Sequence, residues 1–161
     1  MIFVTVGSHE PFDRLIAVTD QLAKAHPDRQ FFAQITARAG YTPTSFPHAA
    51  ELEAKEYDDA CQRATCLVAH AGMGSIITAL ELRKPIVVLP RRAHLGETRN
   101  DHQFDTAMKF KGKPGIFVAE CEDDVPAALE AALAWTPNGD GGTLSAFAED
   151  RLIAFLKDAI A

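Results

Sequence analysis

The stretch that decides the fold is Leu67 to Pro90, LVAHAGMGSIITALELRKPIVVLP, near the middle of the 161-residue sequence. An apolar run that ends at His70 predicts a buried strand, and residues 71–75 (AGMGS) predict a tight turn. We expect a helix from this turn to about Arg83, and a second strand from Ile86 to Leu89. This order of strand, turn, helix and strand is typical of an α/β protein with a parallel sheet.

The turn at residues 71–75 has features of a phosphate-binding site. It leads from the carboxyl end of a strand to a helix N-terminus, where backbone N–H groups and the helix dipole attract anions. Gly72 and Gly74 are expected to adopt positive φ values and, without Cβ atoms, to let an anion approach closely. Ser75 is expected to cap the helix or to donate a hydroxyl hydrogen bond. The alternative is that the glycines only make the turn, and the turn alone does not decide between the two.

Composition and charge restrict the function. The length fits one domain, residues 1–161, and the 47% hydrophobic and 24% charged residues are typical of a soluble globular protein. A net charge of −6 without a run of Lys or Arg argues against general binding of nucleic acid. Three cysteines without metal-ligand spacing predict reduced thiols and no metal site. The sequence shows neither a signal peptide nor a membrane span, so we expect a cytoplasmic protein.

The rest of the chain continues the alternation of strands and helices. Further strands are expected at residues 2–6, 31–35 and 115–118, and further helices at residues 12–23, 56–64, 101–110, 125–133 and 144–160. Residues 36–50 contain Gly40, Pro43 and Pro47 without a clear period and receive no assignment. We therefore predict an α/β fold, a doubly wound parallel sheet of five or six strands with helices on both faces.

The polar loop that follows Pro90, RRAHLGETRN, should lie beside the turn at residues 71–75. Both follow strands of the same sheet, and ligands of open α/β sheets bind at the carboxyl ends of the strands. His70 by itself would fit a buried imidazole that donates to a carbonyl group. The adjacent turn favours a role at the phosphate site instead.

Four segments resemble one enzyme family. They are VTVGSHEPFDRLI at residues 4–16, HAGMGS at residues 70–75, KPIVVLPR at residues 84–91 and NDHQ at residues 100–103. In sequence and order they are similar to the C-terminal, nucleotide-sugar-binding half of GT-B glycosyltransferases, and most closely to glycosyltransferase family 28. The resemblance extends to short stand-alone subunits, such as that of the two-subunit UDP-GlcNAc transferase of dolichol-linked N-glycan synthesis and bacterial exopolysaccharide or capsule counterparts. It covers nearly the whole chain.

The resemblance implies a binding site for a UDP-sugar. In the family the turn holds the diphosphate, and the segment with Gln103 reaches the donor sugar or phosphate. Many relatives carry a Glu, which binds the ribose hydroxyls, at the position of Thr78; Glu81 lies one helical turn further on. The residues assigned in this way to UDP-sugar binding are Gly7, Ser8, His70, Gly72, Met73, Gly74, Ser75, Thr78, Arg91, Asn100, His102 and Gln103.

The resemblance also implies the reaction, an inverting transfer of a hexose or N-acetylhexosamine to a lipid-linked or polysaccharide acceptor. Backbone N–H groups and a cation such as Arg91, Arg92 or Arg99 would stabilise the departing UDP, so neither a metal nor a cofactor is expected. A general base must deprotonate the acceptor hydroxyl. His9 is the first candidate and Glu10 the second, and the base can also belong to another chain.

A complete GT-B enzyme closes two such domains over its substrates, so the resemblance implies a missing half. This partner would be a membrane-anchored subunit that binds the lipid-linked saccharide acceptor and keeps the present chain peripheral at the membrane. An exposed apolar patch is then expected on the cleft side. The alternatives are a non-catalytic nucleotide-binding regulatory module, and an unrelated enzyme on the same scaffold. The absence of GxGxxG after the first strand argues against a dinucleotide enzyme.

Overall fold

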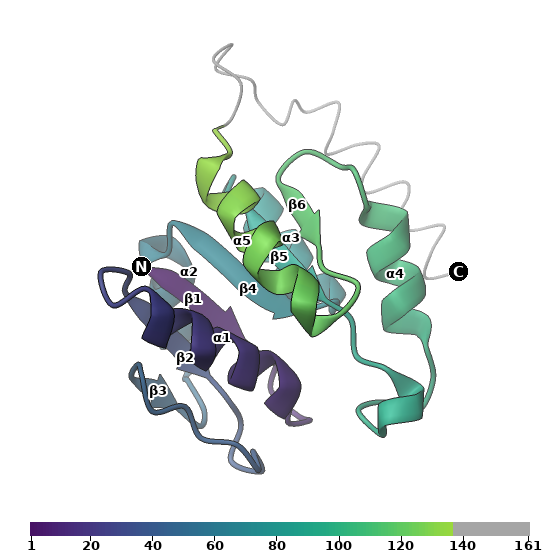
Figure 1. Cartoon of the computed structure of the whole chain (residues 1–161), viewed down its shortest axis with the longest axis horizontal. Helices are drawn as coiled ribbons and strands as arrows, with labels where there is room; N and C mark the ends of the chain where they lie inside the picture. The colour runs from purple at the N-terminus through teal and green to yellow at the C-terminus, as the bar shows by residue number, and fades with distance from the viewer. Residues whose placement is uncertain (137–161) are drawn as a thin grey trace.

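The computed structural model describes residues 1–136, which contain six parallel strands in one sheet (Figure 1). The strands are β1 (Ile2–Thr5), β2 (Phe31–Gln34), β3 (His48–Ala49), β4 (Cys66–His70), β5 (Ile86–Leu89) and β6 (Ile116–Val118). Their spatial order is β3-β2-β1-β4-β5-β6. The chain therefore builds outward from β1 in one direction and then from β4 in the other. Ligands of open α/β sheets bind at this switch point.

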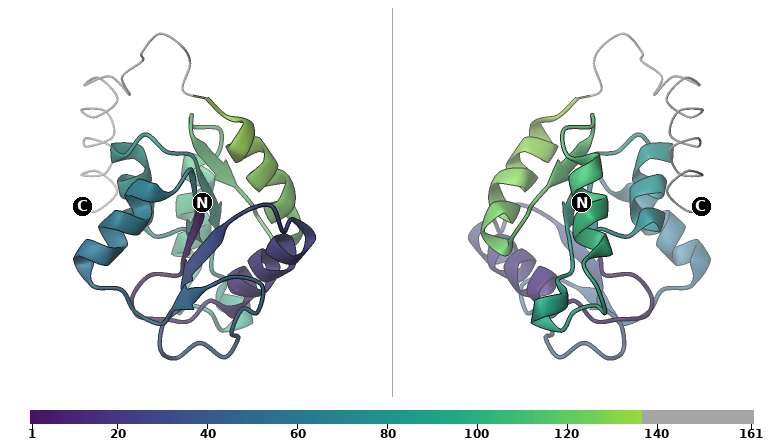
Figure 2. Two further views of the ribbon diagram at one scale, coloured as in Figure 1. Left: turned by 90° about the vertical axis from the view of Figure 1, so that its left-hand side faces the viewer. Right: turned by 90° about the vertical axis from the view of Figure 1, so that its right-hand side faces the viewer.

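Helices cover both faces of the sheet (Figure 2). They are α1 (Asp13–Ala25), α2 (Ala54–Arg63), α3 (Met73–Glu81), α4 (His102–Phe110) and α5 (Val125–Ala134), with short 3₁₀ turns η1 (Ala93–Leu95) and η2 (Glu122–Asp124). The helices α1 and α5 pack on one face, and α2, α3 and α4 on the other. The predicted doubly wound α/β fold is confirmed, while the helix expected at residues 144–160 lies outside the described residues.

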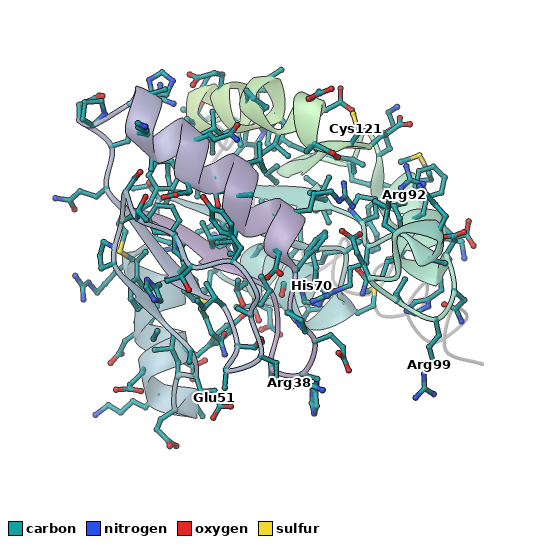
Figure 3. The ribbon with its side chains drawn as sticks, turned by 60° about the horizontal axis from the view of Figure 1, so that its bottom comes forward. Arg38, Glu51, His70, Arg92, Arg99 and Cys121 are labelled. Atoms are coloured by element: carbon teal, nitrogen blue, oxygen red, sulfur yellow. The ribbon has the colours of Figure 1, made fainter. Side chains whose placement is uncertain are left out.

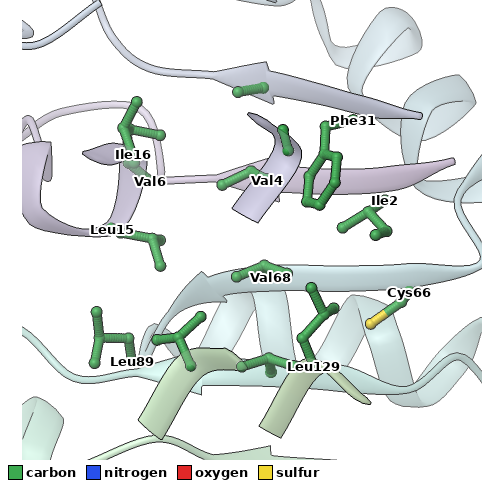
Figure 4. Close-up of a cluster of buried hydrophobic side chains, with 14 of the residues drawn as sticks. Ile2, Val4, Val6, Leu15, Ile16, Phe31, Cys66, Val68, Leu89 and Leu129 are labelled. Carbon is green, nitrogen blue, oxygen red and sulfur yellow. The ribbon is translucent and has the colours of Figure 1, made fainter. Parts of the chain in front are cut away.

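The core forms because the central strands are apolar on both faces. Ile2 and Val4 of β1 face α1 and α5, where they pack with Leu129 (Figure 4). Phe3, between them in sequence, faces α2 and α3 on the opposite side. All four residues of β1 and all four of β5 are buried. Continuous burial of this kind is typical of parallel strands that are covered on both faces.

The segment at residues 36–47, which the sequence pattern leaves unassigned, is held by Asp20 of α1. The Asp20 carboxylate accepts hydrogen bonds from the Tyr41 hydroxyl (2.9 Å) and from the backbone N–H groups of Thr44 (3.0 Å) and Ser45 (2.8 Å). Burial alone would raise the pKa of Asp20, but these hydrogen bonds stabilise the anion and lower its pKa below the ordinary carboxyl value. One carboxylate on a helix therefore orders a loop without regular structure.

Replacement of Asp20 should destabilise the fold in a pH-dependent way. Asp20→Ala should lower the free energy of unfolding by about 2–4 kcal/mol at pH 7, because several donors lose a charged acceptor. The lowered pKa means that the stabilisation is present above the ordinary carboxyl pKa of 3.8 and is lost as the pH falls below it. Urea unfolding at neutral and acidic pH should show the difference from wild type narrowing in acid. Asp28→Ala, at an exposed carboxylate, is the control, and an equal loss there contradicts the assignment.

Candidate functional site

The carboxyl ends of β1 and β4 meet at the imidazole of His70 (Figure 3). A Cβ atom on Gly7, in the β1–α1 loop (residues 6–12), would stand 3.0 Å from His70 Cε1. A Cβ atom on Gly72, directly before α3, would stand 2.1 Å from His70 Nε2. The ring therefore packs against the backbone of both segments. Two of the motifs that the sequence singled out, separated by more than 60 residues, form one site.

The structure corrects the expected role of the glycines in the turn. Gly72 has φ −85° and ψ 136°, and Gly74 lies inside α3, so neither adopts a positive φ. Gly72 is required because the His70 ring occupies the place of a Cβ atom. A Cβ atom on Gly74 would meet no atom within 4 Å, so this residue borders open space. The positive φ at the switch point belongs to Gly7, at 84°.

Helix α3 begins earlier than predicted, and its N-terminus is open. Gly72 is the N-cap, and within the described residues no side chain caps the helix, so the prediction that Ser75 caps it is wrong. The first helical hydrogen bond runs from the Ile76 N–H to the Gly72 carbonyl, at 3.3 Å. The N–H groups of Met73, Gly74 and Ser75 precede this bond and have no helical partner. With the helix dipole they make a site suited to an anion.

His70 is held in its neutral form. Burial is the main cause that lowers its pKa to about 4, the positive charge of Arg91 adds to it, and a contact with the Thr5 backbone opposes it. Nδ1 is buried and makes no hydrogen bond of good geometry with any residue in the range 1–136. At neutral pH the ring therefore offers one N–H donor and one acceptor nitrogen.

The loop between β5 and α4, residues 90–101, reaches the same edge of the sheet. Gln103 at the start of α4 accepts a hydrogen bond from the Arg91 N–H, at 3.3 Å. The predicted residues Asn100 and His102 are exposed, and their side chains contact each other. The Arg99 side chain extends away from His70 (Figure 3). The predicted donor-binding residues thus include a group around His70 and Arg91 and an exposed pair on the loop.

The basic residues that follow β5 bind protein groups. Arg91 is only 3% exposed, and its guanidinium donates to backbone carbonyls of the β1–α1 loop. Arg92 donates to the Glu120 carbonyl at 2.9 Å and lies 3.8 Å from the ring centroid of Phe104. Both cations therefore connect segments at the carboxyl edge of the sheet.

The two candidate bases lie in the β1–α1 loop, and both are exposed. His9 Nδ1 lies 2.8 Å from Ser8 Oγ. Arg38, which sequence reasoning missed, donates to the His9 carbonyl (2.6 Å) and forms an ion pair with Glu10 (3.3 Å). Arg38 lies in the segment without an assignment, two residues after Thr36, whose positive φ of 69° turns the chain at the end of β2. No local pattern marks such a residue, because its partners are nearly 30 residues away.

The described residues do not form the expected exposed apolar patch, so this prediction is wrong for them. The large hydrophobic side chains exposed there are Leu95 of η1 and Leu133 of α5, which lie on separate elements. Two hollows in residues 1–136 lie away from His70, one beside β6 and α5 and the other between β2 and α2. No group of His, Cys, Asp or Glu in this range could hold a metal ion, and no helix in it is long and apolar enough to cross a membrane.

The fold is similar to those of solved glycosyltransferases. The crystal structure of the glycotransferase of kitacinnamycin matches with a TM-score of 0.63 and 21% identity, over 83% of this chain and 35% of the other. The NMR solution structure of ALG13 matches with a TM-score of 0.57 and 18% identity, over 85% of this chain and 90% of the other. At these identities the likeness shows the fold, and it confirms the prediction of a Rossmann-like GT-B half.

The sequence comparisons point to the same family. The UDP-N-acetylglucosamine transferase subunit ALG13 of Mus musculus is 30% identical in an alignment of 132 residues that covers 74% of this chain. The match spans only 10% of that relative. The family model described as glycosyltransferase family 28 C-terminal domain matches residues 1–134. The chain therefore belongs to glycosyltransferase family 28, as a domain of its C-terminal type.

Proposed function

We propose that the chain is the donor-binding catalytic subunit of an inverting glycosyltransferase that uses a UDP-sugar. The sugar, a hexose or N-acetylhexosamine, would pass to a lipid-linked or polysaccharide acceptor. One observation carries the proposal: the open N-terminus of α3 stands at the switch point of the sheet, beside the open space at Gly74. Family membership and the relation to a UDP-N-acetylglucosamine transferase subunit support it.

The N-terminus of α3 would hold the diphosphate of the donor. Negative charge grows on UDP as the bond between the anomeric carbon and the diphosphate oxygen breaks. The N–H groups of Met73, Gly74 and Ser75 are fixed by the helix, so they can stabilise this charge without reorganisation. A neutral His70 can donate one further hydrogen bond. On this view the backbone, together with one imidazole, supplies the main stabilisation of the leaving group.

The acceptor would approach from the side of the β1–α1 loop. Its hydroxyl must lose a proton while it attacks the anomeric carbon from the face opposite UDP. The Glu10 carboxylate is engaged in an ion pair with Arg38 (3.3 Å), whereas the His9 ring lies beside its neighbour Ser8, with Nδ1 2.8 Å from Oγ. His9 is therefore the first candidate for the base on this chain. A base supplied by the partner is the alternative.

The open space at Gly74 supports a second protein as the other wall of the site. This chain matches about a third of the length of the glycotransferase of kitacinnamycin. We propose that the missing part is a membrane-anchored subunit that binds a lipid-linked saccharide acceptor and holds this chain, a cytoplasmic protein, at the membrane. The alternative is a non-catalytic nucleotide-binding module. Thr78 favours this alternative, because many relatives carry an acidic residue at its position.

Titration calorimetry with UDP tests the donor site. Wild type should bind UDP with and without EDTA, and Gly74→Val should weaken binding at least tenfold because its side chain fills the space that the diphosphate needs. His70→Ala should weaken binding as well. Ala127→Val, which places the same side chain in the first turn of α5, is the matched control and should bind like wild type. Folded wild type that binds no UDP, or a Gly74→Val variant that binds it normally, contradicts the assignment.

The low pKa of His70 predicts a stability change in acid. Between pH 6.5 and about 4 the unfolded chain takes up a proton at His70 and the folded chain does not, so stability falls as the pH falls. The loss should reach at most about 1.4 kcal/mol per pH unit. His70→Asn should remove this contribution, while His94→Asn, at an exposed position, should retain it. Urea unfolding at several pH values, with an NMR titration of the imidazole, measures the effect. An ordinary pKa for His70 would refute it.

Reconstitution of sugar transfer distinguishes between the two proposed roles of this chain, a catalytic subunit and a regulatory module. Sugar transfer should require both this chain and a membrane subunit that carries the acceptor domain, and His9→Ala should lower the rate at least 100-fold with little change in UDP affinity. His26→Ala, remote from the loop, is the control. A pair that assembles, binds UDP and transfers no sugar would favour the module. Full transfer by this chain alone would remove the need for a partner.

A further inference from the structure

The Arg91 side chain lies beneath the β1–α1 loop and contacts both of its ends. Its guanidinium donates to the Val6 carbonyl at the start of the loop (2.8 Å). It also donates to the carbonyls of Glu10 (2.7 Å) and Pro11 near the end. A guanidinium is planar and holds its donors in a fixed arrangement, so three acceptors bound to one group are fixed relative to one another. Both ends of the loop are thereby attached to one residue, which follows β5 in the chain.

Further contacts connect Arg91 to two helices. The guanidinium lies 4.7 Å from the ring centroid of Phe12, the buried residue that precedes α1. The Arg91 N–H donates to Gln103 of α4 at 3.3 Å. One residue therefore joins the end of β5, the β1–α1 loop and the start of α4. These are the segments that carry most of the candidate site outside α3.

The burial of Arg91 limits the contact of its guanidinium with a ligand. Desolvation lowers the pKa of Arg91, and the charges of Glu97 and Glu10 raise it, but a guanidinium stays protonated in proteins. At 3% exposure, the group could reach a diphosphate only if it released the loop carbonyls. Release would leave buried carbonyl groups without a donor, at a cost of about 1–3 kcal/mol for each group. The contacts with the loop are thus favoured over a direct contact with a ligand.

We propose that Arg91 is a positioning residue: its guanidinium fixes the β1–α1 loop, and with it the candidate base His9, before any nucleotide binds. The part that concerns His9 rests on the proposed function. The part that concerns the rigidity of the loop does not depend on the proposed function. Arg91 then acts on the reaction through the backbone that it holds, and its positive charge acts on His70 at a distance.

NMR relaxation on the ¹⁵N-labelled full chain, without nucleotide, tests the proposal. Amides of residues 7–10 and of Phe12 should have order parameters of about 0.85 in wild type and below about 0.6 in Arg91→Met. Arg91→Lys should give intermediate values, because an ammonium lacks the planar array of donors. Arg29→Met, which removes a guanidinium paired with Glu130 away from the loop, should match wild type. Any loss of UDP affinity in Arg91→Met should accompany the loss of order in the loop.

A second spectroscopic measurement distinguishes positioning from general stabilisation. The pKa of His70, about 4, should rise in Arg91→Met because a neighbouring positive charge is lost, and should stay unchanged in Arg29→Met. A mobile wild-type loop, or a loop that stays ordered in Arg91→Met, overturns the proposal. So does a tenfold loss of UDP affinity with an ordered loop, which would make Arg91 a diphosphate ligand. If Arg91→Met does not fold, the order parameters of the loop in wild type and in Arg91→Lys test the proposal instead. Failure of wild type to bind UDP would refute the proposed function alone, since the loop data stand without it.

Discussion

The switch point depends on the packing of one imidazole against two glycines. The His70 ring occupies the position that a Cβ atom of Gly72 would take, and it would stand 3.0 Å from a Cβ atom of Gly7. The chain segments that follow β1 and β4 therefore both pack against this ring. This contact also sets the direction in which the chain enters α3, because Gly72 is the N-cap of that helix. The open N–H groups of α3 and the β1–α1 loop consequently share one edge of the sheet.

An acidic chain with a net charge of −6 offers this anion site through its backbone. The basic side chains nearby are bound to protein groups. Arg14 of α1 forms ion pairs with Glu97 and Glu122, both at 2.8 Å, and joins α1 to the β5–α4 loop and to η2. Arg91 binds carbonyl groups in a similar bridging role. Side-chain cations thus shape the edge of the sheet, while helix α3 supplies the positive potential.

The sequence allowed the prediction of features that arise from local patterns. Apolar runs bounded by turn residues located five of the six strands, and the glycines around His70 pointed to the candidate site. Features that depend on distant contacts could not be predicted in this way. The segment at residues 36–47 is ordered by Asp20, far upstream, and nothing in its own composition indicates this. Ser75 has the residue type of a cap but lies inside the first turn, since α3 starts without a side-chain cap.

The lengths of the outermost strands affect how the protein can associate. Within residues 1–136 the sheet ends in β3, with two residues, on one side and in β6, with three, on the other. Edges this short expose few unpaired N–H and C=O groups, so they are poor templates for edge-to-edge aggregation or for a strand donated by another chain. Association through a shared, continuous sheet is therefore disfavoured. Another protein would have to recognise the shape and side chains of the loops instead.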